Sequence, residues 1–198
     1  TYMTYIKLTF ETNANKPYLF IGSKVRGALG YALKDEVCIN PTFECKECFA
    51  KEKCVFYEMY EKQNVTHKYR LDFKLDSKKF KFSIILFEEL QQHKESIKKA
   101  VLKSLEEYKE IDYKEKTKTF KSKKHPSKVL KIEFLTPLRI KKNNLFAITN
   151  DEIGLNDILF SIHKRAQEIQ NQPFTRVEFS KEVKVASKNL SYQEITRK

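Results

Sequence analysis

The chain has 198 residues, of which 39 are lysine or arginine and 26 are aspartate or glutamate, so its formal net charge is +13. Hydrophobic residues make up 40% and aromatic residues 13%, which supports a packed core and excludes wholesale disorder. No apolar run approaches the ~20 residues of a membrane helix and no signal-peptide pattern opens the sequence, so we expect a cytoplasmic protein without a membrane partner.

Hydrophobic periodicity predicts the elements of the first half of the chain. In order they are a strand at Tyr2–Phe10, a helix at Ser23–Glu36, a cysteine-bearing loop at Cys38–Cys54, a short helix at Val55–Lys62, a hairpin of strands at Tyr69–Leu75 and Phe80–Leu86, a helix at Glu88–Tyr108 and a fourth strand around Thr117–Lys121. This order of strands and helices is that of a ferredoxin-like, or RRM-like, domain.

A second series of elements follows the break at His125-Pro126-Ser127. It comprises a strand at Val129–Phe134, a short hairpin across Lys141–Asn144, a helix at Leu155–Gln170 and extended segments at Arg176–Phe179 and Val183–Ala186. No second helix completes the unit. We therefore expect an α+β chain of two tandem ferredoxin-like domains: residues 1–126, with the cysteine-rich loop at 38–54, and an incomplete second domain at 127–198.

The glycines and the positive charge are the first pointers to function. The chain has 4 glycines where about 14 are usual, and three of them, Gly22, Gly27 and Gly30, lie in one nine-residue window. Lys24 and Arg26 fall in the same window, at the start of the predicted helix, where cations and amide groups favour a phosphate. Close packing of the helix on its sheet is the alternative interpretation.

Charge is most concentrated at residues 109–128, which hold eight lysines and three acidic residues. A field of this sign attracts polyanions, above all nucleic acid, with a salt-dependent affinity. Lysines that are merely solvated on every face are the alternative.

Four cysteines, Cys38, Cys45, Cys48 and Cys54, are spaced so that four thiolates suit a structural zinc ion. Only one C-x2-C pair is present, so reduced thiols, a disulfide and an iron–sulfur cluster remain alternatives. A zinc ion with four thiolate ligands has no open position for water and would not perform chemistry.

Two segments resemble a known family. Arg26-Gly27-Ala28-Leu29-Gly30, followed by the cysteine loop and Val55-Phe56-Tyr57, resembles the amino-terminal part of a CRISPR RNA-processing endoribonuclease of the RAMP superfamily. The later Phe134-Leu135-Thr136-Pro137-Leu138-Arg139-Ile140 resembles the start of that family's second half. The resemblance implies two tandem ferredoxin-like domains, repeat RNA and other CRISPR proteins as partners, and a role in antiviral defence. It also implies metal-independent cleavage of precursor RNA to a 2′,3′-cyclic phosphate.

The chain departs from this family at its end. The family ends in a glycine-rich segment that helps to hold the RNA, whereas Gly154 is the only glycine after Gly30. We therefore expect a partial copy, and keep as an alternative a non-catalytic RNA-binding module, such as the RNA-handling domain of a spacer-acquisition fusion with reverse transcriptase and integrase. A zinc-stapled basic adaptor that binds protein is a third possibility.

Metal-free RNA cleavage needs a general base and a cation that stabilises the phosphorane. Of the four histidines, His67 lies beside Lys68 and Arg70, and we assign it as the base, with Lys24 or Arg26 stabilising charge. Further RNA contacts are expected from Lys121, Lys123, Lys124 and Arg139. The aromatic residues expected either to stack on bases or to pack in the core are Tyr57, Tyr60, Tyr69 and Phe120.

Overall fold

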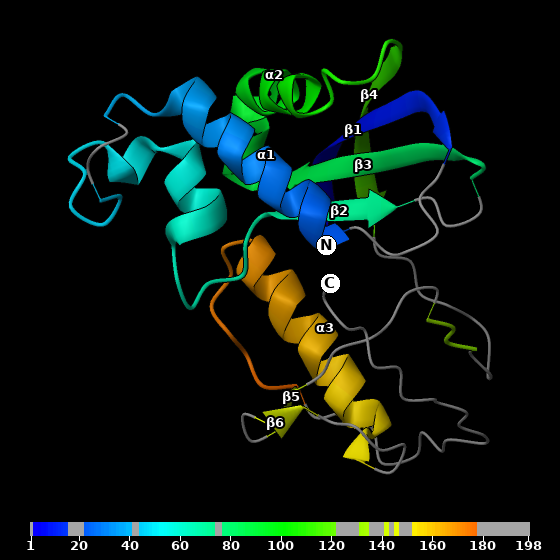
Figure 1. Ribbon diagram of the computed structural model, residues 1–198. Coiled ribbons are helices and arrows are strands. Elements are labelled where there is room, and N and C mark those ends of the chain that lie inside the picture. Colours follow the sequence, from blue (N-terminus) through cyan, green and yellow to red (C-terminus); the bar gives the residue numbers. More distant parts are fainter. Residues whose placement is uncertain are drawn as a thin grey trace. The chain divides into compact units, whose positions relative to one another are not determined.

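The computed structural model divides the chain into two compact units, Thr1–Ser122 and Lys123–Lys198 (Figure 1). It describes residues 2–15, 22–40, 44–73, 77–121, 131–134, 141–142, 145–146 and 152–177. The elements of the first unit are β1 (Tyr2–Asn15), α1 (Gly22–Val37), η1 (Lys51–Lys53), η2 (Tyr57–Glu61), β2 (Tyr69–Phe73), β3 (Lys79–Phe87), η3 (Glu88–His93), α2 (Lys94–Ser104) and β4 (Ile111–Lys121). Those of the second are β5 (Lys141–Lys142), β6 (Leu145–Phe146) and α3 (Leu155–Ile169).

The first unit is a four-stranded antiparallel sheet in the order β2-β3-β1-β4. Since β1 and β2 run parallel with β3 between them, each β-α-β connection crosses over the sheet, and both helices lie over one face (Figure 1). This topology is ferredoxin-like, and the α+β class predicted from the sequence is confirmed.

Strand β1 lies in the interior of the sheet, and its alternate side chains point to the two faces of the sheet. Ile6, Leu8 and Phe10 are at most 9% exposed and share one core with Leu33 of α1 and Ile97 of α2. Fully burying an apolar side chain of this size stabilises the fold by roughly 1.5–3 kcal/mol. Successive side chains of a strand point to opposite faces, so the burial of these three places Tyr5, Lys7 and Thr9 on the other face.

The face of the sheet away from the helices, here called the outer face, follows from the register of the strands. Its residues are Met3, Tyr5, Lys7, Thr9 and Glu11 of β1, Lys81, Ser83, Ile85 and Phe87 of β3, Arg70 and Asp72 of β2, and Asp112, Lys114, Lys116, Lys118 and Phe120 of β4. Two ion pairs cross the strands on this face, Lys7 with Asp72 and Lys81 with Glu11.

Two predicted helices of the first unit differ from expectation. The helix predicted at Glu88–Tyr108 begins with the 3₁₀ turn η3 and becomes α-helical only over Lys94–Ser104. Glu88 has a φ of 45°, a left-handed conformation that turns the chain sharply out of β3 and precludes a regular first helical turn. The helix predicted at Val55–Lys62 is π-helical over Tyr57–Glu61.

In the second unit, the helix predicted at Leu155–Gln170 and the short hairpin are confirmed. The described part of the predicted strand Val129–Phe134, which is Lys131–Phe134, is not a strand, so this prediction is wrong there. Val183–Ala186 lies outside the described residues, as does Arg176–Phe179 beyond Val177. No helix in the described ranges is long and apolar enough to cross a membrane.

The segment after α3 folds back on that helix. Gln167 and Thr175 exchange two hydrogen bonds, of 2.6 Å from Gln167 Nε2 to Thr175 Oγ1 and of 3.2 Å from Thr175 N to Gln167 Oε1. The rings of Phe160 and Phe174 meet edge to face at 5.6 Å.

The glycine window separates into two different environments. A Cβ atom at Gly30 would lie 2.8 Å from Cε1 of Tyr60, so η2 packs on α1 at this point only because Gly30 has no side chain. A Cβ at Gly27 would meet nothing within 4 Å. The window therefore contains one close approach, at Gly30, and the neighbour there is an aromatic ring of η2 and not the sheet on which the helix was expected to pack.

This difference predicts opposite effects for the same substitution. Tyr60 cannot retreat freely, because its hydroxyl donates to the Arg26 carbonyl at 2.8 Å and its ring stacks on Phe56 at 5.4 Å. We expect Gly30→Ala to lower the free energy of unfolding by about 1–3 kcal/mol. The matched control Gly27→Ala should raise it by up to about 1 kcal/mol, the helix propensity of alanine over glycine. Urea denaturation measures both, and equal changes would contradict the packing.

Candidate functional site

Arg26 projects from the first turns of α1 and is held by two tyrosines. Its Nε donates a hydrogen bond to the Tyr69 hydroxyl at 2.9 Å, and its guanidinium carbon lies 4.8 Å from the centre of the Tyr60 ring. Among the described residues, stacking and a single hydrogen bond orient the group and engage one of its five N–H donors. Arg26 is exposed, so its terminal nitrogens are available to an anionic ligand.

His67 precedes β2 and reaches the same tyrosine. Its ring lies 6.1 Å from the Tyr69 ring, and its Nδ1 lies 3.1 Å from the Glu58 carbonyl oxygen. A carbonyl oxygen only accepts hydrogen bonds, so Nδ1 must carry the proton of the neutral ring. The other nitrogen, Nε2, then has a free lone pair, as a general base requires.

Hydrogen bonds from Arg70 and Phe87 hold the backbone at His67 and the residue after it. Arg70 Nη1 donates to the carbonyls of His67 at 2.7 Å and Tyr69 at 2.6 Å. The Phe87 amide donates to the Lys68 carbonyl at 2.9 Å and extends the β2–β3 pairing by one residue. His67 is thereby attached to the rigid edge of the sheet.

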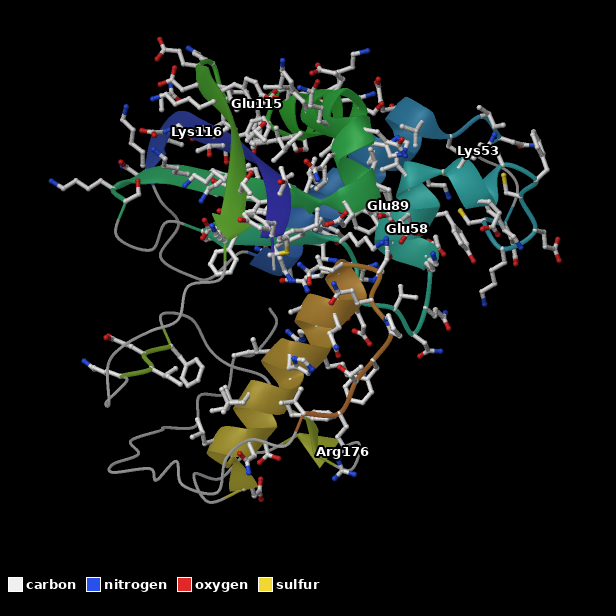
Figure 2. All side chains as sticks on the ribbon, turned by 180° about the vertical axis from the view of Figure 1, so that it is seen from behind. Lys53, Glu58, Glu89, Glu115, Lys116 and Arg176 are labelled. Carbon is white, nitrogen blue, oxygen red and sulfur yellow. The ribbon has the colours of Figure 1, made fainter. Side chains whose placement is uncertain are left out.

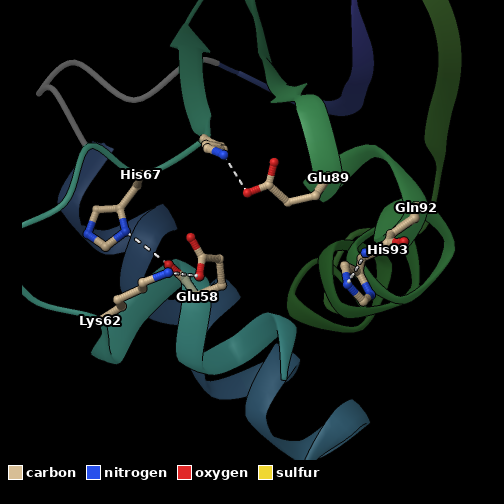
Figure 3. A network of polar contacts seen from close by, with 7 residues as sticks. Glu58, Lys62, His67, Glu89, Gln92 and His93 are labelled. Carbon is tan, nitrogen blue, oxygen red and sulfur yellow. Dashed lines mark hydrogen bonds and ion pairs between the residues drawn. The ribbon is translucent and has the colours of Figure 1, made fainter. Parts of the chain in front are cut away.

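Two ion pairs involve residues that adjoin this histidine in contact or in sequence (Figure 3). Lys62 Nζ donates to Glu58 Oε2 at 2.8 Å, and this bond raises the pKa of Lys62 above its ordinary value. Lys68, only 6% exposed, pairs with Glu89 at the start of η3. Glu58 thus holds His67 through its backbone carbonyl while its side chain is occupied by Lys62.

The structure brings together only part of the predicted catalytic set. Arg26 and His67 converge on Tyr69, whereas Lys24 is exposed and lies two residues from Arg26, about 200° away around the helix axis. Lys121 lies at the end of β4 with its Nζ 5.2 Å from the centre of the Tyr2 ring. The predicted RNA contacts outside the described residues are Lys123, Lys124 and Arg139.

The four predicted stacking aromatics lie in different environments. Tyr57 is the first residue of η2 and is partly exposed. Tyr69 is 6% exposed, and burial raises the pKa of Tyr60 well above its ordinary range, so both serve the packing around Arg26. Phe120 is 57% exposed and lies on the outer face. Sequence reasoning did not single out Tyr5, although the alternation of β1 had already placed it on the polar side.

The cysteine loop lies at the far end of α1 from Arg26. Its four cysteines are free, partly buried thiols, and Cys45 and Cys54 pack against the core. Successive turn hydrogen bonds run from Cys48 N to Cys45 O, from Lys51 N to Cys48 O and from Cys54 N to Lys51 O. Among the residues that the structure describes, no three His, Cys, Asp or Glu side chains are close enough to hold a metal ion. The zinc site stays a prediction from the cysteine spacing.

Comparison with known proteins identifies one family. Residues 2–111, from β1 to the first residue of β4, match the model of the family AF_1859_N, which is described as an N-terminal domain. Neither a curated protein nor a solved structure matches the chain.

Burial predicts a measurable property of the cysteine loop. Desolvation raises the pKa of the Cys45 thiol, so at a given pH the folded protein holds less of its reactive thiolate than the unfolded chain does. The alkylation of Cys45 by iodoacetamide can be measured as a function of pH by peptide mass spectrometry. We expect the pH at its midpoint to be higher in the native protein than in concentrated guanidinium chloride. An equal or lower midpoint would contradict the burial of this thiol.

Zinc ions added before alkylation test the predicted metal site in the same assay. Thiolate ligation would protect all four cysteines together and abolish the pH dependence of Cys45, because metal binding displaces the thiol proton. Unchanged alkylation of the four cysteines at saturating zinc would contradict the zinc prediction.

Proposed function

The chain belongs to the AF_1859_N family of N-terminal domains, and we propose that it binds CRISPR repeat RNA and cleaves it without a metal ion. The observation that carries this proposal is the convergence of Arg26 and His67 on Tyr69. A cation hydrogen-bonded to the Tyr69 hydroxyl and a base whose ring lies 6.1 Å from the Tyr69 ring are the two groups that RNA transesterification needs. The ferredoxin-like topology and the Arg-Gly-Ala-Leu-Gly segment support the same assignment.

His67 is the proposed general base. Its Nε2 removes the proton of a ribose 2′-hydroxyl, and the 2′-oxygen attacks the adjacent phosphorus. The P–O5′ bond then breaks, which leaves a 2′,3′-cyclic phosphate on one product and, after protonation by solvent, a 5′-hydroxyl on the other. The bond from Nδ1 to the Glu58 carbonyl keeps the ring in the reactive tautomer throughout substrate binding.

Arg26 is the residue proposed to bind the phosphate group at the cleavage site. Its terminal nitrogens donate to the non-bridging oxygens, whose negative charge increases in the phosphorane. Tyr69 and Tyr60 fix the guanidinium before RNA arrives, so little orientational freedom is lost on binding. Lys24 faces another side of α1 and contacts a different phosphate of the same strand.

A second candidate function is a non-catalytic RNA-binding module, such as the RNA-handling domain of a spacer-acquisition fusion. The exposed lysines of β4 favour this second function. They lie on one edge strand of the sheet, whereas His67 precedes β2, the strand at the opposite edge. Exposed lysines can bind a polyanion without any catalytic chemistry. The labelled Lys116 and Glu115 mark this strand in Figure 2.

Substitution of His67 tests the catalytic proposal. The amide of asparagine reproduces Nδ1–H and keeps the donor to Glu58, but it has no equivalent of Nε2. We expect His67→Asn to slow cleavage of repeat RNA in EDTA by about 10²–10⁴-fold while RNA affinity is unchanged. The matched control His93→Asn should cleave at the wild-type rate, and mass spectrometry should identify the cyclic phosphate.

Three outcomes separate the alternatives. Wild-type cleavage by His67→Asn would overturn the assignment of the base, and loss of cleavage in EDTA would overturn the metal-independent mechanism. Tight, salt-dependent RNA binding without a cut would leave the non-catalytic module. Weak binding that does not change with salt would favour a protein-binding adaptor, because phosphate contacts always produce a salt slope.

A further inference from the structure

Two aromatic residues of the outer face occupy diagonal positions on the paired strands β1 and β4. Tyr5 is directly opposite Lys118, and Met3 is directly opposite Phe120, so Tyr5 and Phe120 are diagonal neighbours. Such positions lie roughly 7–8 Å apart, within reach of aromatic side chains. Phe120 is 57% exposed and Tyr5 is partly exposed.

A third ring supports this pair from β3. Phe87 is directly opposite Tyr5 in the register, their ring centres are 5.9 Å apart, and Phe87 is only 7% exposed. Tyr5 therefore has the buried ring of Phe87 beside it on β3, and the exposed Phe120 lies diagonally across from it on β4. The central strands of a sheet keep such rings in place without a rearrangement on binding.

The positive charge beside these rings is not neutralised by acidic residues. Three lysines on or beside the sheet have a carboxylate partner: Lys7 pairs with Asp72, Lys81 with Glu11, and Lys94 of α2 with Glu115 of β4 at 2.6 Å. Lys116 and Lys118 are exposed, and within the described ranges neither has an ion-pair or hydrogen-bond partner. Both lie on the outer face, on the strand that carries Phe120.

We propose that Tyr5 and Phe120, with Lys116 and Lys118, form a platform for a single-stranded segment of RNA. Two successive bases stack on the rings while the lysines contact the phosphates of the same stretch. This combination of aromatic faces and cations is how proteins hold unpaired nucleotides, whose bases are not already stacked in a duplex. The choice of RNA rests on the proposed function, whereas the stacking geometry does not.

The platform is separate from the candidate catalytic cluster. His67 and Tyr69 belong to the β2 edge of the sheet, and Tyr69 faces the helices, since it pairs with the buried Leu86. Phe120 lies on the opposite edge strand and the opposite face, and β2 and β4 are three strand spacings apart, or about 14 Å. The platform therefore acts in binding, and the cluster in cleavage.

Binding of one labelled oligonucleotide, as single-stranded RNA, single-stranded DNA and duplex RNA, tests the proposal by fluorescence anisotropy. We expect Tyr5→Ala and Phe120→Ala each to weaken single-stranded RNA binding by roughly 5- to 100-fold, the range for loss of one base–aromatic stack. Phe120→Trp should restore binding. The matched control is Tyr31→Ala, an aromatic residue 84% exposed on α1, which should bind like the wild type.

The lysines have their own readout. The double variant Lys116→Gln/Lys118→Gln should reduce the slope of log affinity against log salt by about 1.4, since each phosphate contact to a single strand contributes about 0.7. The control pair Lys99→Gln/Lys103→Gln on α2 changes the net charge equally and should leave the slope unchanged. Circular dichroism checks the fold, and Phe120→Thr replaces the alanine variant if that variant is unfolded, because threonine suits a strand.

The outcomes distinguish this proposal from the function on which it rests. The platform proposal is wrong if the Tyr5 and Phe120 variants bind like Tyr31→Ala, or if duplex RNA binds as tightly as the single strand. Either result would leave the proposal of cleavage by His67 unaffected. Equal affinity for DNA would overturn the assignment to RNA. Weaker binding by Phe120→Ala with an unchanged cleavage rate at saturating RNA would support the platform even where His67→Asn shows that another base acts.

Discussion

The pairing of β1 on both of its edges is the constraint from which the rest of the first unit follows. With β3 on one side and β4 on the other, this strand cannot slip by one residue without moving Leu8 and Phe10, both fully buried, to the opposite face. The loss of two such side chains from the core would cost roughly 3–6 kcal/mol, a large part of the about 5–15 kcal/mol by which a domain is stable. The register therefore fixes the composition of the outer face as firmly as that of the core, and Tyr5 lies on the outer face because Leu8 lies in the core.

The helix layer imposes a second constraint, at Gly30. Tyr60 enters the space that a side chain at Gly30 would fill, and in doing so places its ring against Arg26 and its hydroxyl on the Arg26 carbonyl. The guanidinium then meets Tyr69, which neighbours His67. A backbone position without a Cβ atom is thus connected, through two tyrosines, to the groups to which we assign cleavage. This gives Gly30 a packing role, whereas the proposed phosphate contact falls to the side chain of Arg26.

Periodicity predicted the strands, the first helix and the topology because one buried face leaves a repeating pattern of apolar residues. It could not predict contacts between distant residues, and neither the fit of Tyr60 to Gly30 nor that of Tyr69 to Arg26 has a signature in the spacing. Lys24 and Arg26 are close in sequence, but helix geometry separates them. The early part of β4 was missed because its apolar alternation is limited to Ile111 and Tyr113, and the rest of this edge strand is exposed. The 3₁₀ turn was missed because Leu90 and Ile97 continue the helical spacing across it.

The lysines of β4 have a simpler explanation that must be weighed against RNA. An exposed edge strand with alternating lysines resists pairing with another chain, and such protection needs no ligand. That explanation accounts for Lys116 and Lys118, but an exposed phenylalanine on the same strand works against it, because an apolar residue on an edge invites the association that the lysines prevent. Phe120 also lies diagonally across from Tyr5 on one side. On the other side of Tyr5, the buried ring of Phe87 packs against it from β3. Protection of the edge and recognition of a single strand are therefore compatible uses of the same charges, and the aromatic pair is the feature that protection of the edge does not explain.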